Sequence, residues 1–321
     1  MQNQKMNEKT ARALLSMEPA ALFKQADEIR RQRKGDDVQV RALLEFSNYC
    51  KRRCAYCGLR CENRSLTRFR LSKEEIIDIG RQAHDAGYRT IVLQSGEDPF
   101  YTPEMIGKIV SEIAKTDITI TLSCGEWNKD VYRYWHDCGA KRYLLKHETA
   151  DPALYRSLHP DSTFSERVQC LYDLKETGYE TGGGFMIGLP GQTVDTIAKD
   201  LALIASIPCD MAGIGPFLPH PQTPLRDAEA GSAEWTLRAV AAARVLLPDA
   251  NLPATTSLGV LDPTQKDHVF ACGANVIMQK VTPVRVRALY EIYPANHQKA
   301  DIIEGRQAVE AQIRAFGRRP V

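Results

Sequence analysis

The chain has 321 residues, and its 42 Lys and Arg residues nearly balance its 40 Asp and Glu residues. This balance gives no electrostatic footprint for binding nucleic acid or a membrane surface, and no run of about 18 apolar residues is present to span a membrane. Nine cysteines, an odd number with most of them isolated, argue against a secreted disulfide framework. Because the N-terminus also lacks the pattern of an export signal, we expect a cytoplasmic protein.

Hydrophobic periodicity predicts a helical lead-in over residues 8–33, followed by strands that alternate with helices. Apolar runs rich in β-forming residues predict strands at 42–46, 90–94, 118–123, 142–146, 183–187, 211–217, 254–257 and 275–279. Amphipathic patterns predict helices at 73–86, 103–115, 128–138, 164–177, 193–207 and 232–246. Ser72 with Glu75 is typical of a capping box, and Gly87 and Gly178 stand where two helices should end.

This alternation indicates parallel strands joined by helical crossovers. Eight candidate strands and no linker-like change in composition favour a single α/β domain, a (β/α)8 barrel of the TIM type. We expect residues 1–41 to form an N-terminal helical extension packed on the barrel, residues 42–321 to form the barrel, and a helix to lie near the C-terminus. An open doubly wound sheet is the alternative, but the glycine-rich nucleotide-binding motif of that fold does not follow the first strand.

Polar and glycine-rich residues follow most of the predicted strands, in segments 95–98, 124–126, 147–149, 188–193, 219–221 and 255–257. In a barrel the carboxyl ends of all strands meet at one face, where active sites are built. Core packing does not require polar residues at these positions. The pattern therefore predicts a site at this face.

Residues 46–60 hold Cys50, Cys54 and Cys57 in a C-x3-C-x2-C arrangement that directly follows the first predicted strand. Thiolates this close together can bind one iron or zinc centre. Structural zinc usually takes two separate cysteine pairs, and ferredoxin-type clusters have a different first spacing. Cys61 adds a fourth thiol, which would close a cluster completely and make the protein an electron carrier rather than an enzyme.

The cysteine loop, with Tyr56 before its last cysteine, resembles the motif of the radical S-adenosylmethionine (SAM) superfamily. The resemblance implies that Cys50, Cys54 and Cys57 bind three irons of a [4Fe–4S] cluster whose fourth iron is left open to SAM. It also implies reductive cleavage of SAM to a 5′-deoxyadenosyl radical, and an electron donor such as flavodoxin or ferredoxin. Cys61 then lies beyond the cluster.

The same resemblance gives SAM-binding roles to residues at several strand ends: Tyr56, Gln94, Gly96, Glu97, Ser123, Glu148, Arg167 and Met186. The charged residues have suitable chemistry, because a carboxylate accepts from an ammonium and a guanidinium binds a carboxylate with two hydrogen bonds. Glu148 and Arg167 are equally consistent with a surface acid and with an ion pair on a helix face. Met186 and Tyr56 are consistent with core packing.

Longer segments resemble the HydE-type maturases of FeFe hydrogenases: 56–60, 92–99, 142–145, 147–150, 188–193, 213–217, 219–221, 247–249, 253–256 and 272–278. The resemblance implies a polar cavity with substrate contacts at Thr121, Arg142, Lys146, Met211, Thr255, Thr256, Tyr290 and Tyr293. It also implies a substrate, a cysteine-ligated iron carbonyl–cyanide precursor used in assembly of the diiron part of the H-cluster.

Two departures from that family concern specificity. Its members have Arg where this chain has Lys146, and Lys keeps the charge but lacks the planar fork of Arg. No cysteine follows Cys272, so the family's auxiliary C-terminal cluster is not expected. The alternative is a radical SAM enzyme of the same branch that acts on another small amino acid or thiol, like methylornithine synthase or biotin synthase. We expect a monomer that takes a small organometallic or amino-acid-derived substrate and works with other maturases.

Overall fold

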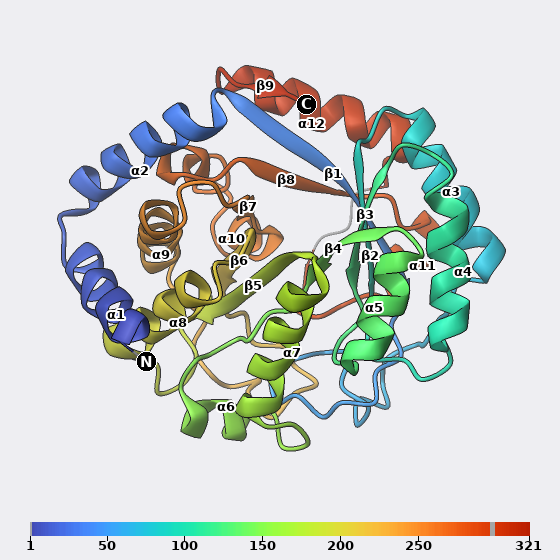
Figure 1. Cartoon of the computed structure of the whole chain (residues 1–321), viewed down its shortest axis with the longest axis horizontal. Coiled ribbons are helices and arrows are strands. Elements are labelled where there is room, and N and C mark those ends of the chain that lie inside the picture. The colour runs from blue at the N-terminus through green and yellow to red at the C-terminus, as the bar shows by residue number, and fades with distance from the viewer. Residues whose placement is uncertain (1, 296–298) are drawn as a thin grey trace.

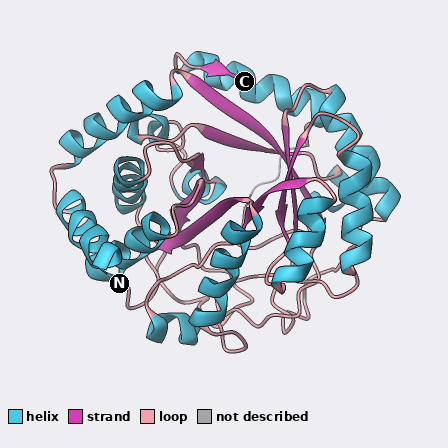
Figure 2. Cartoon of the chain, in the orientation of Figure 1, coloured by secondary structure: helices cyan, strands magenta, loops and turns pink. Residues whose placement is uncertain are grey.

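The computed structural model describes residues 2–295 and 299–321, and parallel strands lie at its centre. The eight strands of this central layer are β1 (Asp37–Ser47), β2 (Thr90–Ser95), β3 (Thr119–Ser123), β4 (Ala140–Leu144), β5 (Glu180–Ile187), β6 (Met211–Pro216), β7 (Pro253–Ala254) and β8 (Val276–Lys280). Helices surround the strands (Figure 1), and the two layers are distinguished by colour in Figure 2. The predicted α/β barrel is confirmed.

The strands pair in the order β6-β5-β4-β3-β2-β1-β8-β7, so every strand of the barrel except β6 is paired with the next one, with β1 following β8. The ring closes between β6 and β7 through one isolated parallel bridge, from Met211 to Asn251. There the backbone N–H of Asn251 donates to the carbonyl of Asp210 at 2.8 Å. A doubly wound open sheet would leave two free edges, so this order excludes that alternative.

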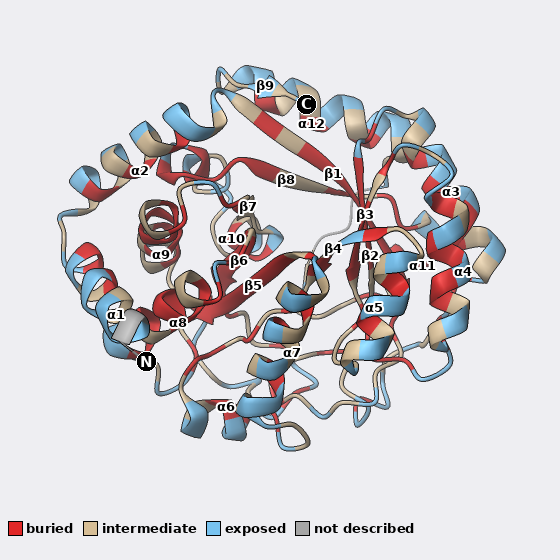
Figure 3. Ribbon diagram, in the orientation of Figure 1, coloured by how far each residue is buried: buried red, intermediate tan, exposed pale blue. Residues whose placement is uncertain are grey.

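Six helices follow strands at the predicted places and cover the barrel: α3 (Lys73–Asp85), α4 (Pro103–Ile113), α5 (Lys129–Asp137), α7 (Phe164–Thr177), α8 (Val194–Ser206) and α9 (Ala233–Leu246). Their buried residues face the strands, and their exposed residues face outward (Figure 3). In α3, for example, Ile76, Ile79 and Ala83 are buried. Each large aliphatic side chain buried in this way contributes about 1.5–3 kcal/mol of favourable transfer free energy.

The predicted helical lead-in is divided into α1 (Gln2–Leu15) and α2 (Pro19–Lys34), with Pro19 in the first turn of α2. Helix α1 packs against α8, and α2 packs against α9. The expected C-terminal helix is α12 (Ile302–Ala315), and the short β9 (Arg319–Pro320) pairs with the start of β1. Because β1 begins at Asp37, the boundary predicted between residues 41 and 42 falls inside this strand.

The local signals at helix ends are confirmed. The backbone N–H of Glu75 donates to the Ser72 hydroxyl at 3.2 Å, and the Glu75 carboxylate accepts from the Ser72 backbone N–H at 2.7 Å, which is the predicted capping box. Gly178 ends α7 with a positive φ of 99°, a conformation that favours glycine.

Two predicted strands are corrected. The strand predicted at 254–257 is shorter and begins one residue earlier, as β7 over Pro253–Ala254. Helix α10 (Thr256–Leu261) follows it. β4 lies at Ala140–Leu144, earlier than the predicted range of 142–146. The periodicity also missed the short elements α6 (Pro152–Leu158), the 3-10 helix η1 (His268–Cys272) and α11 (Val284–Arg287). Within the described part of the chain, no helix has the length and apolarity needed to cross a bilayer.

Candidate active site

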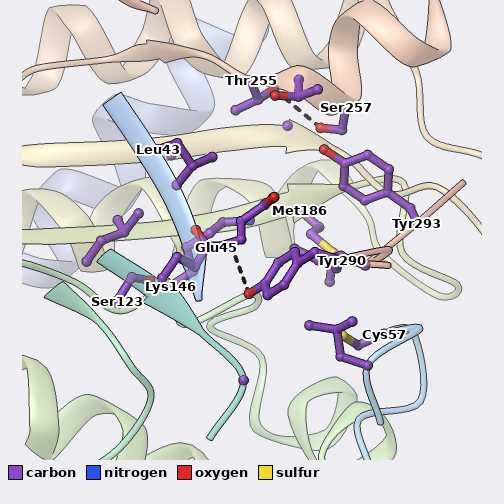
Figure 4. A pocket seen from close by; sticks show the side chains of 18 of the residues that line it. Leu43, Glu45, Cys57, Ser123, Lys146, Met186, Thr255, Ser257, Tyr290 and Tyr293 are labelled. Carbon is purple, nitrogen blue, oxygen red and sulfur yellow. Dashed lines mark hydrogen bonds between the residues drawn. The ribbon is translucent and has the colours of Figure 1, made fainter. Parts of the chain in front are cut away.

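A cavity of about 500 Å³ lies at the carboxyl ends of the strands. Most of the predicted site residues line it: Cys50, Cys54, Tyr56, Cys57, Gln94, Gly96, Glu97, Ser123, Lys146, Glu148, Arg167, Met186, Thr255, Thr256, Tyr290 and Tyr293. Figure 4 shows Cys57 toward one end, Thr255 toward the other, and the rings of Tyr290 and Tyr293 between them. One enclosure thus collects the residues predicted for the cluster, for SAM and for the substrate.

The cysteine loop is fixed by backbone hydrogen bonds to three neighbouring segments: from Lys51 to Glu97, from Ala55 to Leu158 and from Gly58 to Ile292. Gly96 allows the loop to lie directly on the end of β2. A Cβ atom at this position would stand 2.1 Å from the carbonyl oxygen of Tyr49 and 2.8 Å from the Cβ of Cys50. Because atoms cannot approach this closely, the loop needs glycine here.

The three thiols fit an iron–sulfur cluster better than a single ion. Burial raises the pKa of Cys57 to about 12, and burial together with the neighbouring thiols raises that of Cys54. Among the described residues, no three His, Cys, Asp or Glu side chains converge on one metal ion. Three half-buried thiols around a shared cavity suit a larger centre in which each thiolate binds a different iron. The positive irons would then offset the clustering of three thiolates.

Cys61 stands apart from these thiols. It is exposed and does not line the cavity. Its backbone N–H donates to the carbonyl of Arg52 at 2.9 Å, which folds this part of the loop over the outside of the cysteine motif. The arrangement therefore presents three thiols to the cavity, as the superfamily resemblance implies, and not four.

A chain of ion pairs lies beside the cysteine loop. Arg52 contacts Glu97 at 2.6 Å and Glu126 at 2.5 Å, and Arg167 contacts the other oxygen of Glu126 at 2.7 Å. All four side chains are at most 16% exposed, so Arg167 is not an ordinary helix-face residue. Removing one partner from a buried pair of this kind typically costs about 3–5 kcal/mol. Arg52 and Glu126 were not predicted, although both stand within segments that were.

Glu148 occupies a strained turn after β4. It is the one non-glycine residue with a positive φ, 64°, in the described ranges. The backbone N–H of Thr149 donates to the carbonyl of His147 at 2.8 Å, which makes a γ-turn centred on Glu148. Its carboxylate lines the cavity and pairs with Lys146 at 3.0 Å. Such strain persists where the surroundings fix it, commonly at functional sites, and the surface-acid interpretation of Glu148 is wrong.

The turn is backed by two fully buried residues that the sequence analysis did not single out, His147 and Asp200. Their Nε2 and Oδ1 atoms lie 3.3 Å apart. Asp200 also accepts a hydrogen bond from the backbone N–H of Ala150, two residues after Glu148. Burial lowers the pKa of His147 to about 3 and raises that of Asp200. The His147 imidazole is therefore neutral near neutral pH, and burial favours the protonated form of the Asp200 carboxyl beside it.

Tyr56 is fixed from outside the cavity. Its hydroxyl lies 3.0 Å from Nε2 of His159, a buried residue at the end of α6. The ring of His159 stacks on that of Tyr155, with centroids 4.1 Å apart. Tyr56 thus packs in a small aromatic cluster, as the core interpretation suggested, while it also lines the cavity.

The cavity beyond the cysteines is polar, from Tyr290 in its middle to Thr255 at its far end. Gln94 donates to the Tyr290 hydroxyl at 3.2 Å, and the hydroxyls of Thr255 and Ser257 lie 3.4 Å apart (Figure 4). Burial raises the pKa of Tyr290. The hydroxyl groups in this part of the cavity therefore stay protonated at neutral pH and can donate to a ligand.

An ion pair in the cavity wall was missed by sequence reasoning. Glu45 on β1 is 2% exposed and pairs with Lys280 on β8 at 2.8 Å. Burial raises the pKa of Glu45, and the Lys280 ammonium opposes that shift. The available signal was a lone acid near the end of an otherwise apolar strand, in Leu43-Leu44-Glu45-Phe46.

Three predicted substrate contacts do not line the cavity: Thr121, Arg142 and Met211. Arg142 pairs with Glu180 at 2.6 Å, and the Met211 sulfur accepts from Arg41 at 3.0 Å. The Thr121 hydroxyl is buried and has no hydrogen-bond partner among the described residues. All three lie deeper in the barrel than the cavity floor, so the structure separates them from the other candidates.

Comparison with known proteins places this geometry in a family context. The sequence profile of the radical SAM superfamily matches residues 44–204, from β1 to α8. The HydE subunit of the [FeFe] hydrogenase maturase of Thermotoga maritima is 50% identical over 94% of this chain and 86% of its own length.

Relatives of lower sequence identity share the fold. The 3-methylornithine synthase of Methanosarcina acetivorans is 31% identical over 83% of this chain and 77% of its own. A crystal structure of methylornithine synthase superimposes with a TM-score of 0.85 at 26% identity, over 98% of this chain and 94% of the other. The structural similarity thus extends over nearly the whole chain.

Proposed function

The chain belongs to the radical SAM superfamily and, within it, to the family of HydE hydrogenase maturases, and on that premise we propose that it acts on a cysteine-ligated iron carbonyl–cyanide precursor in assembly of the diiron subcluster of FeFe hydrogenase. As a radical SAM enzyme it binds a [4Fe–4S] cluster and SAM. When bound, the cluster supplies the single electron for reductive cleavage of SAM.

In this proposal Cys50, Cys54 and Cys57 hold the cluster, and one iron is left for SAM. Two observations support three ligands over four: these thiols line the cavity, and Cys61 lies outside it. The enclosed position of the loop also limits the access of water to a reactive species formed in the cavity.

SAM is proposed to lie between the cysteine loop and the ends of β2 to β5. Glu148 would accept hydrogen bonds from its ammonium, and Arg167 would bind its carboxylate. The other proposed contacts are Gln94, Gly96, Glu97, Ser123, Met186 and Tyr56. The γ-turn supports this role for Glu148, because it fixes the carboxylate in the cavity before the ligand arrives.

The substrate is proposed to occupy the polar end, near Lys146, Thr255, Thr256, Tyr290 and Tyr293. A cation and several hydroxyl donors, fixed in a partly desolvated cavity, suit an anionic ligand. The observation that carries the proposal is that this polar end and the three thiols share one cavity of about 500 Å³. That volume falls in the usual range for a small-molecule site.

A pair of single variants tests the cluster assignment. After anaerobic reconstitution and addition of dithionite and SAM, we expect 5′-deoxyadenosine from the wild-type protein and from Cys61→Ala, and none from Cys54→Ala. Loss in both variants, or in neither, would contradict the three-ligand site. Complementation of a HydE-deficient strain by the wild-type gene tests the maturase role, and failure of an expressed, SAM-cleaving protein would refute it.

A second candidate is a radical SAM enzyme of the same branch that acts on a small amino acid. The 31% identity and the TM-score of 0.85 to methylornithine synthases favour it, as does Lys146 in place of the family's Arg. The higher identity of 50% to HydE favours the first candidate. Product analysis after incubation with small amino acids separates the two, because only the second candidate predicts an amino-acid product such as methylornithine.

We further propose that the helices before β1 and the barrel act as one domain, and that the protein is a monomer working beside other maturases. The packing of α1 on α8 and of α2 on α9 supports the first point. Size-exclusion chromatography with light scattering tests the second, and a stable dimer would refute it.

A further inference from the structure

The positive charge of the chain is concentrated in the loop that carries the cysteines. Residues 51–70 hold seven of the 42 Lys and Arg residues and one of the 40 Asp and Glu residues. This loop therefore has a formal charge of +6, whereas the rest of the chain has −4. A nearly neutral chain thus has one strongly cationic segment, and this segment carries the ligands of the proposed cluster.

Three of these cations are used to fold the loop. Arg52 binds Glu97 and Glu126. Arg68 donates to several backbone carbonyls of the loop, including that of Leu59 at 2.9 Å. Arg70 forms an ion pair with the Asp98 carboxylate, and its guanidinium lies over the ring of Tyr49. These side chains explain part of the charge by structure alone.

Three others, Lys51, Arg53 and Arg64, are exposed, and we call them the basic collar. The side chain of Lys51 is 54% exposed and 3.7 Å from its nearest carboxylate, and that of Arg53 is 47% exposed and 4.0 Å from its own. Arg64 forms no ion pair within the described ranges of the chain. Ion pairs as long and exposed as those of Lys51 and Arg53 are weak, so these side chains keep most of their positive charge available to an approaching molecule.

The collar lies directly behind the cluster ligands. Cys50 and Cys54 line the cavity, while Lys51 and Arg53, their neighbours in sequence, are exposed. Consecutive Cα atoms are about 3.8 Å apart. One short segment therefore turns its thiols and Arg52 inward and turns Lys51 and Arg53 outward, so the proposed cluster is about one residue from the surface. Residues 60–64 stay on the same face, since the Arg60 guanidinium reaches the carbonyl of Arg53 at 3.4 Å.

We propose that the basic collar is the docking surface for an acidic one-electron carrier protein that reduces the cluster. The step transfers one electron: the carrier is oxidised by one electron and the cluster is reduced by one. Opposite charges at the collar steer the carrier to this face, while the net negative charge elsewhere disfavours other orientations. The inference rests on the proposed function in so far as the three thiols hold a reducible cluster.

Stopped-flow reduction of the reconstituted cluster by flavodoxin hydroquinone tests the proposal. The variant Arg53→Glu/Arg64→Glu should be reduced about tenfold more slowly than wild type at low ionic strength. The matched control is Lys9→Glu/Lys108→Glu, which changes the net charge equally at exposed positions on α1 and α4 and should keep the wild-type rate. The difference should shrink at about 0.5 M salt, where charges are screened within a few ångströms.

Two further measurements separate this inference from the proposed function. Dithionite should bleach the clusters of wild type and both variants equally; a wild-type chain without a dithionite-reducible cluster would refute the proposed function itself. Binding of oxidised flavodoxin, measured by calorimetry, should weaken in the collar variant alone. Equal flavodoxin rates in collar and control variants would overturn the docking surface while leaving the enzyme intact. If the reversed charges disturb the loop, Arg53→Gln/Arg64→Gln removes the cations without adding acids and should still slow reduction.

Discussion

His159 provides a pH-dependent test of how the cysteine loop is held. Its Nδ1 lies 3.2 Å from the backbone carbonyl of Tyr155, which can only accept, so Nδ1 carries the proton. Nε2 is then the acceptor for the Tyr56 hydroxyl at 3.0 Å. Burial, reinforced by the Arg167 and Arg52 guanidinium groups, lowers the pKa of His159 from 6.5 to about 3. Protonation would end this acceptance and bury a cation near two others.

The sign and size of the effect follow from proton linkage. Between pH 6.5 and about 3 the unfolded chain binds a proton at His159 that the folded chain does not, so the unfolding free energy falls as the pH drops below 6.5. The loss is about 1.4 kcal/mol per pH unit, or about 2 kcal/mol by about pH 5.

Urea denaturation of wild type and His159→Gln at about pH 7 and about pH 5 measures this contribution. Glutamine has both an acceptor and a donor but does not titrate, and the other titrating groups are the same in both proteins. We expect wild type to lose about 2 kcal/mol more than the variant over this range. An equal loss in both proteins would refute the inference that His159 is held neutral.

Three further substitutions, two of them with a control variant, probe the cavity. A Cβ atom on Gly96 would lie 2.1 Å from a backbone carbonyl oxygen, so Gly96→Ala should bind much less iron after reconstitution than wild type, as measured by iron assay. The control is Gly213→Ala, whose Cβ would lie 3.8 Å from the Lys146 side chain. This variant should bind as much iron as wild type. Lys146→Arg should keep SAM cleavage but change substrate affinity in a binding titration, and unchanged affinity would show that Lys146 does not contact the substrate. Asp200→Ala removes the hydrogen-bond acceptor behind the Glu148 turn and should weaken SAM binding about tenfold or more, as measured by equilibrium dialysis. The control variant Asp200→Asn keeps an acceptor oxygen and should bind SAM with nearly the wild-type affinity.

The barrel was predictable because each helix and most strands have strong local signals. The helix at 164–177 was predicted with its observed bounds: Gly178 marks its end in the sequence, and in the structure Thr163 caps its start. Residues 254–257 show the limit of such signals. Two threonines and a serine favour a strand by local propensity, but Thr255 precedes α10 and turns its hydroxyl into the cavity.

Site residues at the carboxyl ends of the strands could be predicted from the sequence, but how far the cavity extends into the barrel could not. Ser123 ends β3 and lines the cavity, whereas Thr121, on the same face two residues earlier, lies about 6.6 Å deeper. Sequence patterns give the face of a strand but not the level at which side chains close the barrel interior. The pair of Glu45 and Lys280 was missed for another reason: it joins β1 and β8, which are far apart in the sequence and lie side by side only in the folded sheet.

Lys146 inside the cavity and the basic collar outside it should act independently, because salt screens their charges to different extents. Lys146 pairs with Glu148 in a cavity where both are mostly buried, and charges there are weakly screened by salt. Arg53 and Arg64 face bulk water, where salt reduces their reach to about 8 Å at physiological ionic strength. Electron transfer at the proposed docking surface and substrate binding at the proposed cavity site can therefore be altered separately by mutation. The cysteine loop makes this separation possible, since its three thiols line the cavity while Arg53 and Arg64 are exposed on the outside.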